Sequence, residues 1–159
     1  MTGSPPPVTA LTIGLFSELV AVDQLMRARL TKALPRGMEL SHFMLLNYLA
    51  VSREERSPAQ LARKFHVTKP AMTNTIGRLE RAGHVHVRPD WEDGRRKQVV
   101  ISPAGIAARN HALDSIAPLM ETAAATLGVD QIRAALPILR QLRAFLSPDA
   151  GGRPGDWDR

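Results

Sequence analysis

The spacing of apolar residues predicts a chain built mainly of α-helices. Over residues 9–34 the apolar side chains recur at steps of three and four, which places them on one face of a long helix. A second helix is expected over residues 41–51, and it is apolar nearly all round, as buried helices are. Two further helices are expected over residues 103–127 and 130–146, with Pro137 kinking or dividing the last one. The apolar face of the first helix comprises Leu11, Leu15, Leu19, Val22, Met26 and Leu30.

Two short helices separated by a tight break are expected between these long ones. Ser57, Pro58 and Gln60 form a capping box at the start of the first short helix. Thr68 is placed to cap the second short helix, and Gly83 is placed to end it. The inward-facing residues of the pair are expected to be Leu61, Ala62, Phe65, Ala71, Met72, Ile76 and Leu79.

A β-hairpin is expected to follow the second short helix. Residues 84–88 and 98–102 alternate apolar and polar side chains, as short strands do. The polar loop between them, residues 89–97, contains an Asp-Gly turn. Two short helices followed by a hairpin make the pattern of a winged helix-turn-helix, here over about residues 38–103. The predicted fold class is therefore mainly α, with a two-stranded β-hairpin as the wing.

The basic charge of the chain is concentrated in this central module. Ten Lys and Arg stand between Arg56 and Lys97 against four acids, and the excess equals the whole net charge of +6. A basic module between neutral flanks favours a polyanionic partner such as nucleic acid. A basic surface that is merely solvated is the alternative.

The composition narrows the class of protein. With 159 residues, 44% of them hydrophobic, the chain suits a single globular domain and is too short for a TIM barrel. Aromatic residues make up 4%, which argues against a single-strand binder built on many stacking platforms. The chain has no cysteine, which excludes disulfides, thiolate metal sites and cysteine redox sensing.

The second short helix would read DNA in such a fold, because the second helix of a helix-turn-helix enters the major groove. Its outward residues are small, polar or basic, and they include Lys69, Thr73, Asn74 and Arg78. An arginine on a thin wing can enter the minor groove, and Arg95 is the candidate. The alternatives are an ordinary polar helix face and a loop kept in solution by mixed charges.

Two stretches of the sequence resemble the MarR family of regulators. Residues 61–83 look like the helix pair of that family, including an Arg-Leu-Glu run and a closing glycine. Residues 90–105 look like its wing, with an Asp-x-x-Asp-x-Arg pattern followed by a strand and a helix start. Ile101-Ser102 stands where Leu-Thr is commoner, which is a mild departure. The resemblance covers about residues 9–147.

The resemblance implies a homodimer in which residues 9–34 and 103–147 form the dimerisation helices. Such a dimer would bind a palindrome in double-stranded DNA, with half-sites about one turn apart. Arg95 matches the minor-groove arginine of the family, and Ser57 and Gln60 lie where phosphates could be met. The expected DNA-binding residues are Ser57, Gln60, Thr68, Lys69, Pro70, Thr73, Asn74, Arg78, Arg95, Arg96 and Lys97.

The resemblance also implies a small aromatic or anionic effector, because members of the family often bind such ligands between the dimer helices and the winged domain. The candidate lining residues are Phe16, Leu19, Met38, Leu40, His42, Phe43 and Leu46. Among them, His42 could form a hydrogen bond with a carboxylate or a phenol. Simple core packing is the alternative for each of these residues.

No metal, cofactor or catalytic site is expected. His84 and His86 share one face of a strand, but no acid or thiol stands at a diagnostic spacing from them. The sequence has no phosphate-binding glycine loop and no paired nucleophile and base, so we expect no enzyme.

The two ends of the chain are expected to be disordered. Residues 1–8 are proline-rich and residues 148–159 are rich in Gly and Pro, which leaves a single domain over residues 9–147. No Lys or Arg precedes Arg27, so the charged start of a signal peptide is missing. No uninterrupted apolar run approaches the roughly 20 residues that cross a bilayer. A cytoplasmic location is expected.

The combined expectation is a ligand-responsive repressor that binds a palindromic operator as a homodimer. One alternative is a non-specific architectural DNA-binding protein without a ligand. Another is a protein–protein module that uses the winged fold. The ratio of operator affinity to random-DNA affinity at one salt concentration separates the first two hypotheses.

Overall fold

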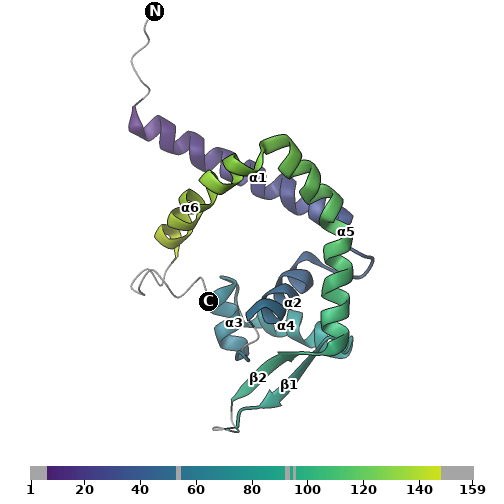
Figure 1. Ribbon diagram of the computed structural model, residues 1–159. Helices are drawn as coiled ribbons and strands as arrows, with labels where there is room; N and C mark the ends of the chain where they lie inside the picture. The colour runs from purple at the N-terminus through teal and green to yellow at the C-terminus, as the bar shows by residue number, and fades with distance from the viewer. Residues whose placement is uncertain (1–6, 53–54, 92–93, 95, 148–159) are drawn as a thin grey trace, which may run out of the picture.

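Six helices and one β-hairpin make up the described part of the computed structural model, residues 7–52, 55–91, 94 and 96–147 (Figure 1). The mainly helical fold with a two-stranded wing is confirmed. In Figure 1, α2, α3, α4 and the hairpin lie together, and α5 runs from them toward α1 and α6. The elements are α1 (Val8–Ala33), α2 (Leu40–Ser52), α3 (Pro58–Lys64), α4 (Lys69–Arg81), β1 (Val85–Pro89), β2 (Lys97–Ile101), α5 (Pro103–Leu127) and α6 (Val129–Leu146).

The ends of these elements follow the local capping signals. α1 begins at Val8, one residue inside the arm that was expected to be disordered, and residues 1–6 and 148–159 lie outside the described residues. α5 ends at Leu127 and is capped by Gly128, whose φ of 83° suits glycine. α6 continues through Pro137, so this proline does not divide the helix.

Each strand of the wing is shifted by one residue from its expected position, with β1 one residue later in the chain and β2 one residue earlier. β1 and β2 are antiparallel, with Val85 opposite Ile101 and Pro89 opposite Lys97. This register brings residue 97 into the ladder and leaves His84 outside it. Val85 and the central Val99 are the fully buried residues of the two strands, so the apolar face of the wing packs onto the helices.

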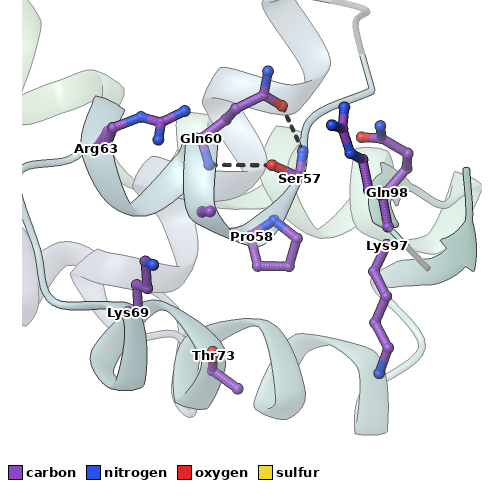
Figure 2. A pocket seen from close by; sticks show the side chains of 10 residues that line it. Ser57, Pro58, Gln60, Arg63, Lys69, Thr73, Lys97 and Gln98 are labelled. Atoms are coloured by element: carbon purple, nitrogen blue, oxygen red, sulfur yellow. Dashed lines mark hydrogen bonds between the residues drawn. The ribbon is translucent and has the colours of Figure 1, made fainter. Parts of the chain in front are cut away.

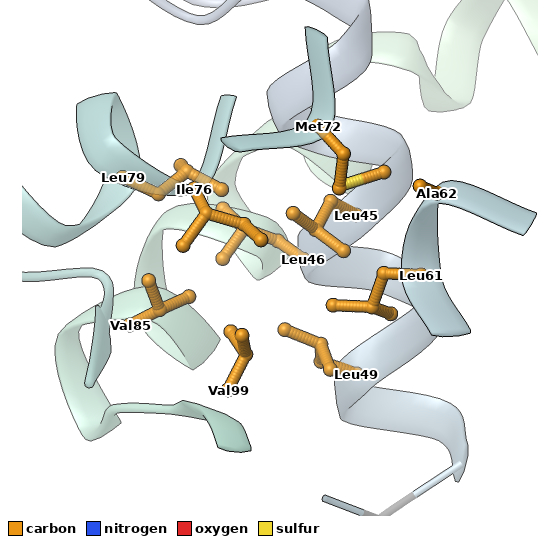
Figure 3. Close-up of a cluster of buried hydrophobic side chains, with 10 residues drawn as sticks. All are labelled: Leu45, Leu46, Leu49, Leu61, Ala62, Met72, Ile76, Leu79, Val85 and Val99. Carbon is orange, nitrogen blue, oxygen red and sulfur yellow. The ribbon is translucent and has the colours of Figure 1, made fainter. Parts of the chain in front are cut away.

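One hydrophobic core joins α2, α3, α4 and the hairpin, which together we call the winged unit (Figure 3). α4 contributes three residues at helical spacing to it, positions 72, 76 and 79. Ala71 was expected on this face and is exposed, because it lies off the stripe that these three positions define. Phe65 packs against the core while partly exposed. The buried members are Leu45, Leu46, Leu49, Leu61, Ala62, Met72, Ile76, Leu79, Val85 and Val99.

A second, smaller cluster attaches the winged unit to the long helices. Leu34 follows α1, Phe43 belongs to α2, and Ala112 and Ile116 belong to α5. All four side chains are buried. This cluster therefore fixes the direction in which α5 leaves the winged unit.

A hydrogen-bonded joint at Ser102 connects α4, the wing and α5. The Ser102 hydroxyl donates to the carbonyl of Gly83 at 2.6 Å and accepts from the N–H of Gly105 at 3.0 Å. The Ser102 N–H donates to the carbonyl of His84 at 3.0 Å. A Cβ on Gly105 would lie 2.0 Å from that same His84 carbonyl oxygen, so a side chain does not fit there.

The long terminal helices are largely uncovered in the single chain. Neither α1 nor α6 has a buried residue, and the predicted apolar stripe of α1 is exposed at Leu11, Leu15, Val22 and Met26. By length and composition, α1 is the one described helix that could span a membrane. The sequence expectation that no segment reaches this length is therefore corrected, although one such helix near an N-terminus is weak evidence for a membrane span.

We predict that Gly105→Ala lowers the free energy of unfolding by about 1–3 kcal/mol, because the new methyl group overlaps the His84 backbone. Urea unfolding followed by circular dichroism measures this difference. Gly77→Ala in α4 is the matched control, since nothing lies within 4 Å of its added Cβ. This control variant should be as stable as the wild type or more stable. Equal stability of Gly105→Ala and the wild type would contradict the proposed joint.

Candidate nucleic-acid interface

A groove of about 570 Å³ runs between α3, the start of α4 and the wing (Figure 2). Residues from all three elements line it, and we call it the wing groove. Its lining residues are Ser57, Pro58, Ala59, Gln60, Arg63, Lys69, Thr73, Arg96, Lys97 and Gln98.

The start of α3 is held against the wing from two sides. The predicted capping box is present, because the Ser57 hydroxyl accepts from the N–H of Gln60 at 3.3 Å and the Gln60 side-chain oxygen accepts from the N–H of Ser57 at 2.8 Å (Figure 2). Just before the cap, the carbonyl of Arg56 accepts from the N–H of Val99 in β2 at 2.9 Å. The first turn of α3 therefore cannot shift without shifting β2.

The start of α4 is placed by its own cap and by the core. The Thr68 hydroxyl accepts from the N–H of Ala71 at 3.3 Å, as the sequence predicted. Burial of Met72 and Ile76 fixes the rotation of the helix, and it leaves Lys69 and Thr73 exposed beside the buried stripe. The two side chains lie one helical turn apart on the side of α4 that borders the groove.

The lining of the wing groove is cationic. Arg63, Lys69, Arg96 and Lys97 contribute four positive side chains, and the ten lining residues include no acid. The other lining residues are small, polar or apolar, so the backbone of α4 can be approached closely. Such a surface suits a chain of phosphates better than it suits a neutral ligand.

The structure brings six of the eleven predicted DNA-binding residues to the groove and places four elsewhere, while one lies outside the described residues. The six are Ser57, Gln60, Lys69, Thr73, Arg96 and Lys97. Thr68, Pro70 and Asn74 are exposed at the start of α4 without lining the groove. Arg95 lies outside the described residues, so its expected place in the minor groove stays a prediction.

Arg78 has a different partner from the one that the sequence suggested. Its guanidinium forms an ion pair with the carboxylate of Glu39, just before α2. Both side chains are about half exposed, so the pair contributes little stability. It does direct Arg78 away from the wing groove and toward the start of α2.

Sequence reasoning missed four lining residues of the groove. Pro58 and Ala59 belong to the first turn of α3, and Gln98 follows Lys97 in β2. Arg63 stands three positions after Gln60, one turn further along α3. Helical spacing from Gln60 could have identified Arg63, whereas the position of Gln98 depends on the contact between α3 and the wing.

The seven residues expected to line an effector site lie in different parts of the described structure. Leu46 is fully buried in the core of the winged unit, and Phe43 belongs to the second cluster. Leu19 lines a separate cavity of about 390 Å³ between α1, α6 and the turn after α3, where His66 also lines it. Phe16 is half-buried on α1, and Met38, Leu40 and His42 lie at the start of α2 or just before it.

His42 is nevertheless an unusual residue of α2. It is 7% exposed, and its Nδ1 accepts from the N–H of Glu39 at 3.4 Å. Its Nε2 is buried and has no hydrogen-bond partner among the described residues. Burial lowers the pKa of His42 because it penalises the imidazolium; Arg78 and His84 act in the same direction, and Glu39 opposes them.

The described residues show no group of three or more His, Cys, Asp or Glu that could hold a metal ion. His86 is exposed on the wing, and His111 is exposed on α5.

The arrangement of two helices, a wing and a cationic groove defines a winged helix-turn-helix protein. The family model that describes the MarR family matches residues 36–96, which run from just before α2 to just before β2 and include α2, α3, α4 and β1. The match of residues 36–96 to the MarR family model confirms the resemblance found in the sequence. No curated protein matches the chain closely enough to count as a relative.

Solved structures share the fold over nearly the whole chain. The transcriptional regulator BldR from Sulfolobus solfataricus is 22% identical, with a TM-score of 0.75 over 88% of this chain and 99% of BldR. A mutant of MarR from E. coli, solved in complex with operator DNA, is 20% identical, with a TM-score of 0.73 over 86% of this chain and 98% of MarR.

An organohalide-sensing regulator solved with bound 2,4-dichlorophenol, RdhR-CbdbA1625, is a third similar structure. It is 18% identical, with a TM-score of 0.74 over 93% of this chain and 90% of its own. At these identities the likeness concerns the fold, which is that of MarR-family transcription regulators.

The lowered pKa of His42 predicts a pH-dependent stability. The unfolded chain takes up a proton near the ordinary pKa of about 6.5, whereas the folded chain resists protonation. The free energy of unfolding should therefore fall as the pH drops below about 6.5, until the folded-state pKa is passed. In urea unfolding, the free energy of unfolding of His42→Gln should fall less than that of the wild type between about pH 7.5 and 5.5.

His111→Gln is the control for this measurement, because it makes the same substitution at an exposed position. It should keep the pH dependence of the wild type. If His42→Gln keeps it as well, the burial of a neutral imidazole at position 42 is not what sets the dependence.

Proposed function

We propose that the chain is a sequence-specific, double-stranded DNA-binding transcription regulator of the cytoplasm. It acts as a homodimer on a palindromic operator and represses transcription until a small effector binds. The observation that carries the proposal is the wing groove, where α4, α3 and the wing bring four cations together.

The groove supports DNA as the ligand through both its charge and its shape. Lys69 and Thr73 lie in the first turns of α4, the part of a recognition helix that meets base edges in the major groove. A threonine hydroxyl or methyl can contact a base there, and lysine can reach guanine or phosphate. Arg96 and Lys97 on the wing are positioned for the neighbouring backbone.

The uncovered terminal helices support the homodimer. α6 exposes Ile138 and Phe145, which are 60% and 76% exposed in the single chain, on the same helix face. Together with the exposed stripe of α1, they leave large apolar side chains in water along both terminal helices, and such exposed apolar patches mark interaction sites. A second copy with the same stripes can cover both helices in a two-fold arrangement.

The proposed effector response and repressor role depend on how the terminal helices are connected to the wing groove. α5 joins them to the Ser102 joint, so a change in the angle of α5 would move α4 and the wing together. An effector would act by binding better to the dimer whose grooves misfit the operator. The dichlorophenol bound by one structural neighbour supports a small aromatic ligand, and phenols are the first compounds to test.

The direct test compares two duplexes of equal length at about 150 mM salt. One comes from upstream of the gene for this protein, and the other has random sequence. A specific regulator should prefer its site by about a thousandfold or more. Equal, weak binding to the natural duplex, to random DNA and to any duplex enriched from a random pool would favour the architectural alternative. No binding to any duplex at low salt would refute DNA binding altogether.

We predict that Arg63→Ala weakens DNA binding and lowers the slope of log K against log salt by about one unit, because one cation leaves the groove. Fluorescence anisotropy of a labelled duplex measures both quantities. Arg133→Ala is the control: it removes the same charge from α6, where Arg133 pairs only locally with Asp130. Equal slopes for Arg63→Ala and the control would exclude α3 from the interface.

We predict that the wild type sediments as a dimer of the 17.4 kDa chain, and that Ile138→Asp with Phe145→Asp shifts it to the monomer. Buried carboxylates oppose association because each must lose its hydration. Arg140→Asp introduces the same carboxylate at an exposed position on the opposite face of α6, two residues after Ile138, and should stay dimeric. A wild type that sediments at the mass of one chain would contradict the proposed assembly.

A further inference from the structure

Trp91 stands at the tip of the wing with its side chain almost wholly in solvent. At 87% exposure, it is the most exposed large apolar side chain among the described residues. An indole left in water forgoes the roughly 2–3 kcal/mol that burial of a large side chain provides. Its exposure therefore indicates a contact that the single chain does not make.

The backbone at Trp91 is tied to the wing groove. The N–H of the preceding residue, Asp90, donates to the carbonyl of Arg96 at 2.8 Å. The carboxylate of Asp90 also accepts from the side-chain amide of Gln98. Because Arg96 and Gln98 both line the groove, these bonds place Trp91 next to its wing side.

A cation lies behind the indole. The guanidinium of Arg88 is 6.0 Å from the centre of the Trp91 ring, and an ion pair with Glu55 holds Arg88 in place. One part of the ring therefore has a positive neighbour, while most of its surface stays open. A partner that covers the open part of the ring must offer apolar surface, and the cationic wing groove beside it favours a partner that is also negatively charged.

The sugar–phosphate edge of duplex DNA has this combination, since deoxyribose carbons alternate with phosphates. We propose that Trp91 is a DNA-contact residue, whose indole packs against deoxyribose at the minor-groove edge beside the wing. The contact is apolar and independent of base identity, so it adds affinity without adding salt dependence. This inference rests on the proposed DNA-binding function, and it concerns a residue whose side chain lies outside the cationic lining.

Tryptophan fluorescence tests the contact directly, because the chain has only two tryptophans, Trp91 and Trp157. In a Trp157→Phe background the emission reports Trp91 alone. The probe is a labelled duplex of about 30 base pairs, long enough for two half-sites one turn apart and enriched on this protein from a random pool. On binding, the Trp91 emission should change and become shielded from acrylamide, over the same protein concentrations at which the anisotropy of the duplex rises.

Trp91→Ala should weaken binding by about tenfold, as buried interface tryptophans do, while the salt slope stays that of the wild type. Trp91→Phe should keep most of the affinity. The thermal unfolding midpoint should not change, because the side chain is exposed.

The outcomes separate this inference from the proposed function. If the duplex binds but Trp91 stays accessible to acrylamide and Trp91→Ala binds normally, the inference is wrong, the DNA-binding function stands, and the indole serves another partner such as a protein. If Trp91→Ala lowers the salt slope along with the affinity, the apolar contact is also refuted. If no duplex binds at any salt concentration, the proposed function itself fails.

Discussion

A single backbone hydrogen bond, from the N–H of Val99 to the carbonyl of Arg56, decides how the parts of the wing groove meet. Arg56 stands directly before the serine that caps α3, and Val99 is the buried centre of β2. The bond therefore links the first turn of one helix to the strand of a hairpin more than thirty residues further along the chain. With α4 packed on the same core, three separate elements can present their cations to one surface.

The joint at Ser102 extends this rigidity beyond the winged unit. One serine side chain bonds the end of the α4 turn and the start of α5, and the missing side chain of Gly105 allows α5 to approach the His84 carbonyl. A rotation of α5 must then move α4 and the wing as one body. In a dimer held by α1 and α6, this connection makes the spacing of the two wing grooves depend on the geometry of the interface. A palindromic operator binds well only when the spacing of its half-sites matches the spacing of the grooves.

The features that the sequence predicted correctly involve residues that are close together in the chain. The caps at Ser57 and Thr68 and the end of α4 at Gly83 involve residues within three or four positions of one another, so spacing alone identifies them. The ion pair between Arg78 and Glu39 joins residues far apart in the chain, and no local pattern reveals it. The same holds for Gln98, which reaches the groove only because β2 pairs with Arg56.

The effector residues illustrate a second limit of the sequence. Phe16, Leu19 and Leu46 share an apolar character, and the family resemblance assigned all three to one expected site. The fold then distributes them among α1, a cavity beside α6 and the central core. Apolar spacing identifies which residues are shielded from water, but it does not tell a cavity wall from a packed core.

The central claim, that α4 lies in the DNA groove of a two-fold dimer, can be tested by directed cleavage, because the chain has no cysteine of its own. An iron chelate attached to Thr73→Cys should cut an enriched duplex at two positions about one helical turn apart. The same chelate on Asp114→Cys, an exposed position midway along α5, should leave the duplex intact. Uncut DNA with Thr73→Cys under conditions where the duplex is bound, or equal cutting from both positions, would contradict the account.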